Sequence, residues 1–340
     1  MTAAPSEILA TDYHTAGEPF RIVTAGAPQL PGTDVPDRRE RAQRSADAEF
    51  VRRLLCHEPR GHADMYGCFL VPPDDPGADL GAVFWHKDGY STACGHGTIA
   101  LGAWAVESGR VPAAPDGDTD VVVDVPSGRV VARVRCDRGA VAAVTFRNVP
   151  AYVVAVGVPV QIAAGTVAVD VAYGGAIYAS LPAAAVGLRV APESYAELIA
   201  TGREIRAALN ESGVASHPSD ARLSGVYGTI FFEDGGDGPA GPRQRNVTVF
   251  ADGEVDRSPC GSGTSARAAL LHAEGRLLPG RELLHESIVG TQFRAQVVAS
   301  VRADDRDAVV TEIEGTSFRT GEHRFMLDAR DSLSPGFVLR

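Results

Sequence analysis

The stretch CGHGT at Cys94–Thr98 occurs a second time, with one change, as CGSGT at Cys260–Thr264. The likeness continues beyond this core, because the same shift in numbering also superposes Gly109 on Gly275. Two copies in the same chain indicate an internal duplication, and therefore a protein built from two related halves.

Each copy predicts a glycine-rich turn that leads into a helix. Alanine-rich runs of good helix formers follow both turns, at Thr98–Glu107 and Thr264–Glu274. A glycine then stands where each helix would end. This pattern places each cysteine at the N-terminus of a helix.

A cysteine in that position has chemical consequences. The first backbone N–H groups of a helix lack intrahelical partners, so they can stabilise a thiolate and hold a carboxylate. Such a thiol can have a pKa well below the free value of about 8.5. Two of them suggest an acid and a base on opposite faces of one small anionic substrate. The alternative is a pair of buried structural cysteines, but a packing role would not need the flanking glycines in both copies.

Composition narrows the possible partners and compartments. The 340 residues, 44% hydrophobic and 22% charged, suit a globular protein with two full cores. A net charge of -11 argues against nucleic acid and anionic membranes as partners. The chain shows no apolar membrane span or signal-peptide pattern, and its five cysteines are odd in number and widely spread, so we expect a reducing, cytoplasmic location.

The strand pattern places the boundary between the halves. Three valine-rich segments within residues 121–146, separated by turn residues, predict an antiparallel meander. Asn148–Pro150 closes it, so we expect a first half over residues 1–149 and a second over 150–324. Residues 325–340 could return as a strand that completes the first half.

Other polar segments have two interpretations each. His14 with Glu18, and His62 with Asp64, stand beside glycines; catalysis is one option, and a hydrogen-bonded or solvated turn is the commoner one. Ser91 or Thr92 could bind substrate, but capping the first helix is expected. The glycine pair Gly174–Gly175 within a strand pattern suggests a close approach of backbone or ligand.

Four motifs, taken together and in order, resemble those of the proline racemase family. They are HTAGEP at His14–Pro19, RGHADMYG at Arg60–Gly67, CGHGT at Cys94–Thr98 and DRSPCGSGT at Asp256–Thr264. The resemblance extends from about Asp12 to the end of the chain. The family includes proline racemases, 4-hydroxyproline 2-epimerases and trans-3-hydroxyproline dehydratases.

The resemblance implies a fold like that of diaminopimelate epimerase. This is an α/β fold of the α+β kind, with two pseudo-symmetric halves that each wrap a mostly antiparallel sheet around a central helix, and with the active site in the cleft between them. It also implies that Cys94 and Cys260 are the catalytic thiols. The other implied site residues bind substrate, with backbone amides on its carboxylate and the His96 and Asp256 side chains on its ring nitrogen: Gly95, His96, Gly261, Ser262 and Asp256.

The resemblance leaves the reaction open between two classes. Ala176, where racemases and 4-hydroxyproline epimerases more often carry Asn, and the run Tyr90–Thr92 are dehydratase-like, whereas Cys260 stands where dehydratases usually carry Thr. Both thiols favour racemisation or 2-epimerisation of proline or a hydroxyproline. Dehydration of trans-3-hydroxy-L-proline is the alternative, and an anion-binding module without chemistry is a third interpretation.

No cofactor or metal is expected, because the sequence contains no phosphate-binding loop, dinucleotide fingerprint or zinc-ligand spacing. The expected partner is a small-molecule substrate. A homodimer is one assembly open to such a chain.

Overall fold

The computed structural model describes residues 7–328 and 330–339 of the chain. It forms two compact units, one of residues 1–144 and 316–340 and the other of residues 145–315. The sequence predicts that the first half ends at residue 149 and that the chain returns to it near residue 325. The observed units divide earlier at both places, after residue 144 and at residue 316. The returning strand is Ser317–Met326, not a segment within 325–340. It starts earlier because its whole length pairs with the first strand of the chain.

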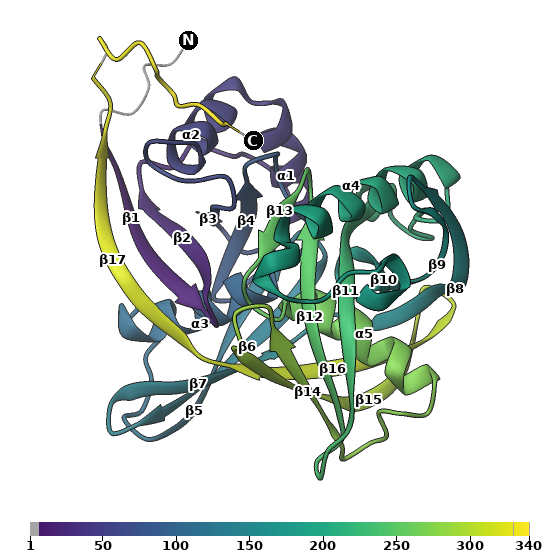
Figure 1. The fold of residues 1–340 in the computed structure, drawn as a ribbon. Helices are drawn as coiled ribbons and strands as arrows, with labels where there is room; N and C mark the ends of the chain where they lie inside the picture. The colour runs from purple at the N-terminus through teal and green to yellow at the C-terminus, as the bar shows by residue number, and fades with distance from the viewer. Residues whose placement is uncertain (1–6, 329, 340) are drawn as a thin grey trace. The chain divides into compact units, whose positions relative to one another are not determined.

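The sheet of the first unit has the strand order β17-β1-β2-β3-β4-β5-β6 (Figure 1). Pairing is antiparallel except between β2 and β3 and between β4 and β5. The strands of this sheet are β1 (Glu7–Thr15), β2 (Glu18–Ala25), β3 (Tyr66–Val71), β4 (Leu80–His86), β5 (Gly117–Val125), β6 (Gly128–Asp137) and β17 (Ser317–Met326). The helices of this unit are α1 (Val35–Arg44), α2 (Ala46–Cys56) and α3 (Gly95–Glu107), and β7 (Ala140–Arg147) contains the boundary between the units.

Helix α3 forms the centre of the first unit. Its residues from Gly95 to Ala105 are all buried, and it contacts β1, β2, β5, β6 and β17. A helix that is apolar on every side requires such a covered position. Gly102 allows a close approach to β6, because a Cβ there would lie 2.6 Å from the Cβ of Ala132. The helix ends as predicted, with Gly109 at φ +70°.

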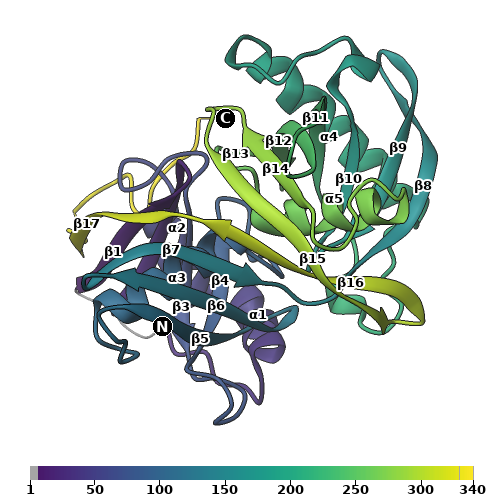
Figure 2. The same ribbon diagram turned by 90° about the horizontal axis from the view of Figure 1, so that it is seen from below.

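The strands of the second unit pair in a closed ring. The order is β14-β12-β11-β10-β9-β8-β16-β15 and back to β14, and Figure 2 shows β15 beside β16. The strands are β8 (Ala151–Ile162), β9 (Gly165–Tyr173), β10 (Ile177–Pro182), β11 (Val226–Asp237), β12 (Pro242–Phe250), β13 (Glu254–Asp256), β14 (Glu282–Ser287), β15 (Gln292–Ala303) and β16 (Arg306–Gly315).

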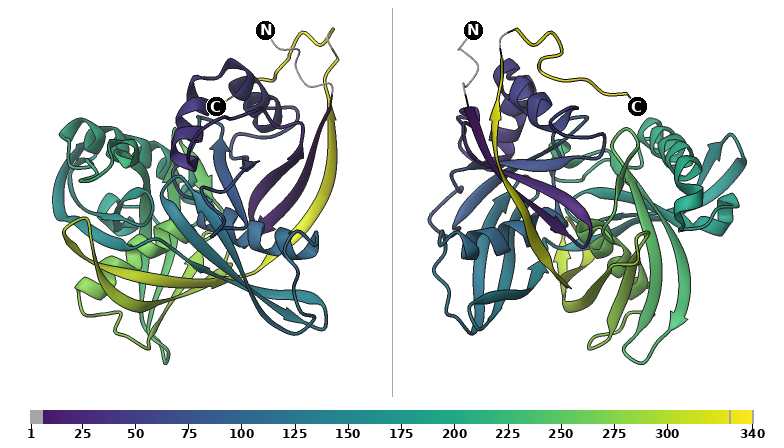
Figure 3. Two further views of the ribbon diagram at one scale, coloured as in Figure 1. Left: turned by 180° about the vertical axis from the view of Figure 1, so that it is seen from behind. Right: turned by 60° about the vertical axis from the view of Figure 1, so that its left-hand side comes forward.

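The two long helices of the second unit have different environments. Helix α5 (Gly261–Ala273) is buried from Gly261 to Leu271 and contacts β8, β9, β10, β15 and β16. Helix α4 (Tyr195–Ser212) buries only one side and lies on the outside of the unit, against β8, β11 and β12 (Figure 3). Short 3-10 helices occupy residues 183–186, 192–194 and 221–223. The predicted sheet around a central helix is therefore confirmed in both halves.

None of the helices in the described part of the chain combines the length and the apolar character needed to cross a membrane.

Candidate active site

Cys94 lies at the N-terminus of α3, as predicted. It is the N-cap residue, in extended conformation, and its sulfur accepts a hydrogen bond from the Gly97 N–H at 3.2 Å. Gly97 leaves the room for this contact, because a Cβ there would lie 2.7 Å from the sulfur and 2.4 Å from the Phe20 ring. The amide donor stabilises negative charge on the sulfur.

His96 lies directly beside this thiol. Its Nε2 is 3.5 Å and its Nδ1 3.7 Å from the Cys94 sulfur. The rings of Phe20 and Tyr66 stand edge-on to the imidazole, with centroids 5.7 Å and 5.0 Å away. The Thr15 hydroxyl donates to the His96 carbonyl. These contacts fix a titratable ring next to the sulfur.

The expected cap by Ser91 or Thr92 is wrong. The capping atom is the sulfur of Cys94, because α3 begins at Gly95 and Cys94 is therefore its N-cap residue. Ser91 instead hydrogen-bonds the Tyr66 hydroxyl. Ser91 thereby holds one of the rings that flank His96.

Cys260 lies at the N-terminus of α5, but its backbone differs from that of Cys94. It has φ +63°, in the left-handed region that a non-glycine residue rarely adopts. The Ser258 hydroxyl accepts from the Cys260 N–H at 3.1 Å and donates to Asp256 at 2.7 Å. All three residues are buried. Their hydrogen bonds hold the Cys260 backbone in its strained conformation.

The Cys260 sulfur is buried, and hydrogen bonds with the Gly263 amide and the Thr248 and Tyr178 side chains only partly offset this burial. It packs in a cluster with Ala172, Ile230 and Leu270, and its thiol lies 3.8 Å from the Tyr178 hydroxyl. Burial, followed by the negative charge of Asp256, raises the pKa of Cys260 far above its usual value. The expectation of a lowered pKa is therefore wrong for this thiol, because loss of hydration outweighs the helix N-terminus.

The two thiols thus differ in their electrostatic environment. Both sulfurs accept a hydrogen bond from a backbone amide, of Gly97 and Gly263, but only the Cys94 sulfur lies beside an imidazole. The Cys260 sulfur faces a carboxylate in an apolar cluster, which suits a neutral thiol. The two duplicated positions therefore differ in the charged and polar groups around their sulfur atoms.

The first amides of both helices can bind an anion. α3 starts at Gly95 and α5 at Gly261, so the N–H groups of Gly95, His96, Gly261 and Ser262 belong to first turns that have no intrahelical acceptors. Asp256 and His96 are buried beside the thiol of their own unit. Each half therefore combines a thiol, first-turn amides that could bind an anion, and one polar side chain.

Gly174 is the close approach that the glycine pair predicts. A Cβ at this position would lie 2.4 Å from the Ser262 carbonyl in the first turn of α5. Asn148 joins the same two segments, since its side-chain amide donates to the Gly174 carbonyl at 2.8 Å and to the Ser265 hydroxyl at 2.9 Å. Of the two expected possibilities, backbone or ligand, the close approach at Gly174 is therefore to another backbone segment.

Gly174→Ala is expected to destabilise the protein by about 1–3 kcal/mol, because the added methyl must displace the first turn of α5. Gly235→Ala is the matched control, since its nearest contact would be 3.3 Å at an exposed position. Urea denaturation of both variants measures the difference. Equal stability of the two variants would show that the contact is unimportant.

Ser258→Ala is expected to lower turnover about tenfold through kcat, because the Cys260 N–H and the Asp256 carboxylate each lose a hydrogen-bond partner. Ser258→Thr keeps the hydroxyl and should recover most of the loss. Steady-state kinetics of both variants, beside circular dichroism, provides the comparison. If Thr and Ala variants lose activity equally, the hydroxyl does not position Cys260.

The other polar segments lie in turns. The His14 Nδ1 accepts from the Gly17 N–H at 3.1 Å, and the His62 Nδ1 from the Asp64 N–H at 3.2 Å. The hydrogen-bonded turn is confirmed at both places. Asp64 is buried, however, so that turn is not a solvated one.

Three side chains near the thiols were not predicted from sequence. Phe20 and Tyr66 reach His96 from β2 and β3, and Tyr178 reaches Cys260 and the Ser262 hydroxyl, at 2.6 Å, from β10. Tyr178 follows the glycine pair closely, which was the available signal. Aromatic residues within strand patterns are otherwise indistinguishable from core residues.

Comparisons with known proteins identify the family of this chain. A family model described as proline racemase matches residues 10–338. A 3-hydroxyproline 2-epimerase of Burkholderia multivorans is 43% identical over 97% of this chain and 97% of its own length. A trans-3-hydroxy-L-proline dehydratase of Burkholderia cenocepacia is also 43% identical, over 97% of both chains. The crystal structure of a hydroxyproline epimerase from Agrobacterium vitis, with bound trans-4-hydroxy-L-proline, matches with a TM-score of 0.91 and 31% identity, covering 98% of this chain and 95% of that one.

Proposed function

Because the chain belongs to the proline racemase family, we propose that it inverts the α-carbon of a 3-hydroxyproline by a two-thiol, cofactor-independent mechanism. The observation that carries the proposal is the pair of buried thiols at two helix N-termini, with an imidazole beside Cys94 and the Asp256 carboxylate acting on Cys260. In the resting protein Cys94 is the base and Cys260 the acid. The proposal requires both thiols to meet one substrate from opposite faces.

The α-proton is weakly acidic, so its removal needs stabilisation of the negative charge that develops on the carboxylate. The first amides of α3 and α5 supply preorganised donors for that charge. Cys94 takes the proton as a thiolate, and the Cys260 thiol delivers its own proton to the opposite face. His96 and Asp256 bind the protonated ring nitrogen, which lowers the barrier further.

The 3-hydroxyl is proposed from two relatives that are each 43% identical to this chain, because their names specify 3-hydroxyproline. The Agrobacterium vitis structure, with trans-4-hydroxy-L-proline, is less similar in sequence. We therefore propose a substrate with its ring hydroxyl at C3, next to the reacting carbon, and not at C4.

Dehydration of trans-3-hydroxy-L-proline is the second candidate, because several relatives carry that name. In this compound the 3-hydroxyl lies on the ring face opposite the carboxylate, and so on the same face as the α-hydrogen. Loss of that proton and of the hydroxyl as water gives an enamine that tautomerises to a ketimine. Both departing groups are on the face of the base, so a thiol on the other face has no part in elimination. Retention of Cys260 therefore favours epimerisation.

The test is to incubate the protein separately with trans-3-hydroxy-L-proline, trans-4-hydroxy-L-proline and L-proline. Chiral chromatography detects the 2-epimers, and an o-aminobenzaldehyde stain detects the ketimine. The expected result is the 2-epimer of the 3-hydroxy compound as main product. Ketimine without epimer would establish the dehydratase, and turnover of the 4-hydroxy compound or proline alone would refute the 3-hydroxyl.

A further inference from the structure

Arg267 is a buried cation without an ion-pair partner in the described part of the chain. It lies on α5, two helical turns after Cys260, with 1% of its surface exposed. Its Nε donates to Gln244 at 3.2 Å and its Nη1 to the Ser180 hydroxyl at 3.1 Å, both neutral acceptors. Its guanidinium lies 4.0 Å from the centre of the Phe232 ring. Buried charges are rare unless they are paired.

The environment of Arg267 penalises its positive charge. Burial lowers the pKa of Arg267 to about 10, although Glu274 and more distant carboxylates act in the opposite direction. The Nη2 atom makes no hydrogen bond with the described residues. The guanidinium therefore retains a donor for a further acceptor.

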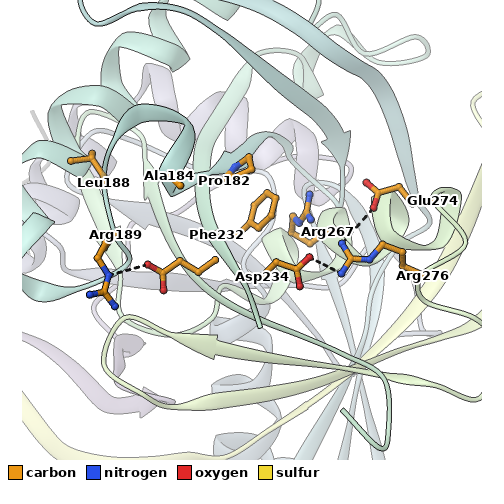
Figure 4. Close-up of a pocket in the computed structure, with 10 residues that line it drawn as sticks. Pro182, Ala184, Leu188, Arg189, Phe232, Asp234, Arg267, Glu274 and Arg276 are labelled. Atoms are coloured by element: carbon orange, nitrogen blue, oxygen red, sulfur yellow. Dashed lines mark ion pairs between the residues drawn. The ribbon is translucent and has the colours of Figure 1, made fainter. Parts of the chain in front are cut away.

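Arg267 is one of the residues that line a pocket of about 570 Å³ on the second unit. Figure 4 shows Arg267 and Phe232 between the two ends of this pocket, with Pro182 and Leu188 as further apolar lining. A carboxylate entering the pocket would reach a cation that is already desolvated and held by two hydrogen bonds. Such preorganisation favours binding.

The rim of the pocket has the opposite charge. Arg189 pairs with Glu233 at 3.7 Å, and Arg276 pairs with both Asp234 at 2.6 Å and Glu274 at 3.9 Å (Figure 4). Three carboxylates thus face two arginines, so the rim carries one negative charge in excess. A simple anion would be attracted by Arg267 and repelled by the excess negative charge of the rim. A zwitterion carries one charged group that is complementary to each.

We propose that this pocket is a binding site for a small amino acid, separate from the thiols. The carboxylate of the ligand binds the Arg267 guanidinium, its ammonium group binds the rim carboxylates, and an apolar side chain lies against Phe232, Pro182 and Leu188. The site shares α5 with Cys260, so an occupant contacts the helix that positions this thiol.

The test compares L-leucine with its two halves, 4-methylpentanoate and 3-methylbutylamine, by isothermal titration calorimetry on the full-length protein. L-leucine should bind one equivalent, and each half-ligand at least about tenfold more weakly, because each lacks one charged group. Saturation with pyrrole-2-carboxylate, a flat mimic of the deprotonated intermediate, should leave leucine binding unchanged. Displacement of leucine, or equal binding of leucine and either half-ligand, would overturn the proposal, as would no binding at millimolar concentration.

Two variants locate the site. Arg267→Met should weaken leucine binding at least about tenfold, and Arg203→Met, on α4 and outside the pocket lining, should not change it. Both should bind pyrrole-2-carboxylate like wild type, which reports an intact fold. Unchanged leucine affinity in Arg267→Met would refute the site. If Arg267→Met does not fold, the relative affinities of L-leucine and its two half-ligands for the wild-type protein test the proposal.

Discussion

Cys94→Ser and Cys260→Ser are each expected to lower the rate of epimerisation by roughly 10²–10⁴-fold, the usual contribution of one general acid or base. A serine hydroxyl at either helix N-terminus is too weak an acid to exchange a proton at neutral pH. The fold should persist, since each substitution changes one buried atom in a helix cap. Chiral chromatography of the reaction mixture measures the rates.

Proton exchange provides the control for these two variants. In deuterium oxide, Cys260→Ser retains the thiol of Cys94, so it should exchange the α-hydrogen of one of the two C2 epimers without inverting it. Cys94→Ser should exchange only the other C2 epimer, if at all. Full epimerisation by either variant would remove that cysteine from the mechanism, and loss of all exchange with altered circular dichroism would indicate unfolding.

The second large effect concerns thiol reactivity. Iodoacetamide at pH 7.5 should alkylate Cys94 at least about tenfold faster than Cys260, because only a thiolate reacts and burial raises the pKa of Cys260. The rate at Cys260 should still rise about tenfold per pH unit at pH 9, since the pH remains below its pKa and each unit increases the thiolate fraction tenfold.

Site-resolved mass spectrometry gives the two rates, and pyrrole-2-carboxylate should protect both thiols. Cys68 is the internal control, because burial also raises the pKa of its thiol. Faster labelling of Cys260 than of Cys94 would reverse the assignment of acid and base. If Cys56 or Cys68 is alkylated first and activity survives, the assignments of Cys94 as base and Cys260 as acid are both wrong.

The duplicated motif predicted the local structure of the site well. Glycines at fixed distances from each cysteine require a tight turn and a helix end, and both cysteines are indeed N-cap residues of buried helices. The central position of these helices follows from their apolar character on all sides. Local sequence therefore contained the information needed for this part of the fold.

The sequence could predict only part of the difference between the thiols. His96 and Asp256 belong to the local motifs, whereas Tyr66 and Tyr178 reach the respective sites from β3 and β10, which the tertiary fold brings there. The burial of both thiols is likewise a property of the folded units. The long-range contacts of Arg267 with Ser180 and Gln244 were unpredictable for the same reason.

The most direct test of the two-thiol mechanism is the early reaction of wild-type protein with trans-3-hydroxy-L-proline in deuterium oxide, followed by proton NMR. If Cys94 and Cys260 act as separate base and acid, the 2-epimer forms with deuterium at its α-carbon, while the remaining substrate keeps its hydrogen. Deuterium entering the remaining substrate as fast as the product, or ketimine forming with no epimer, would contradict the mechanism.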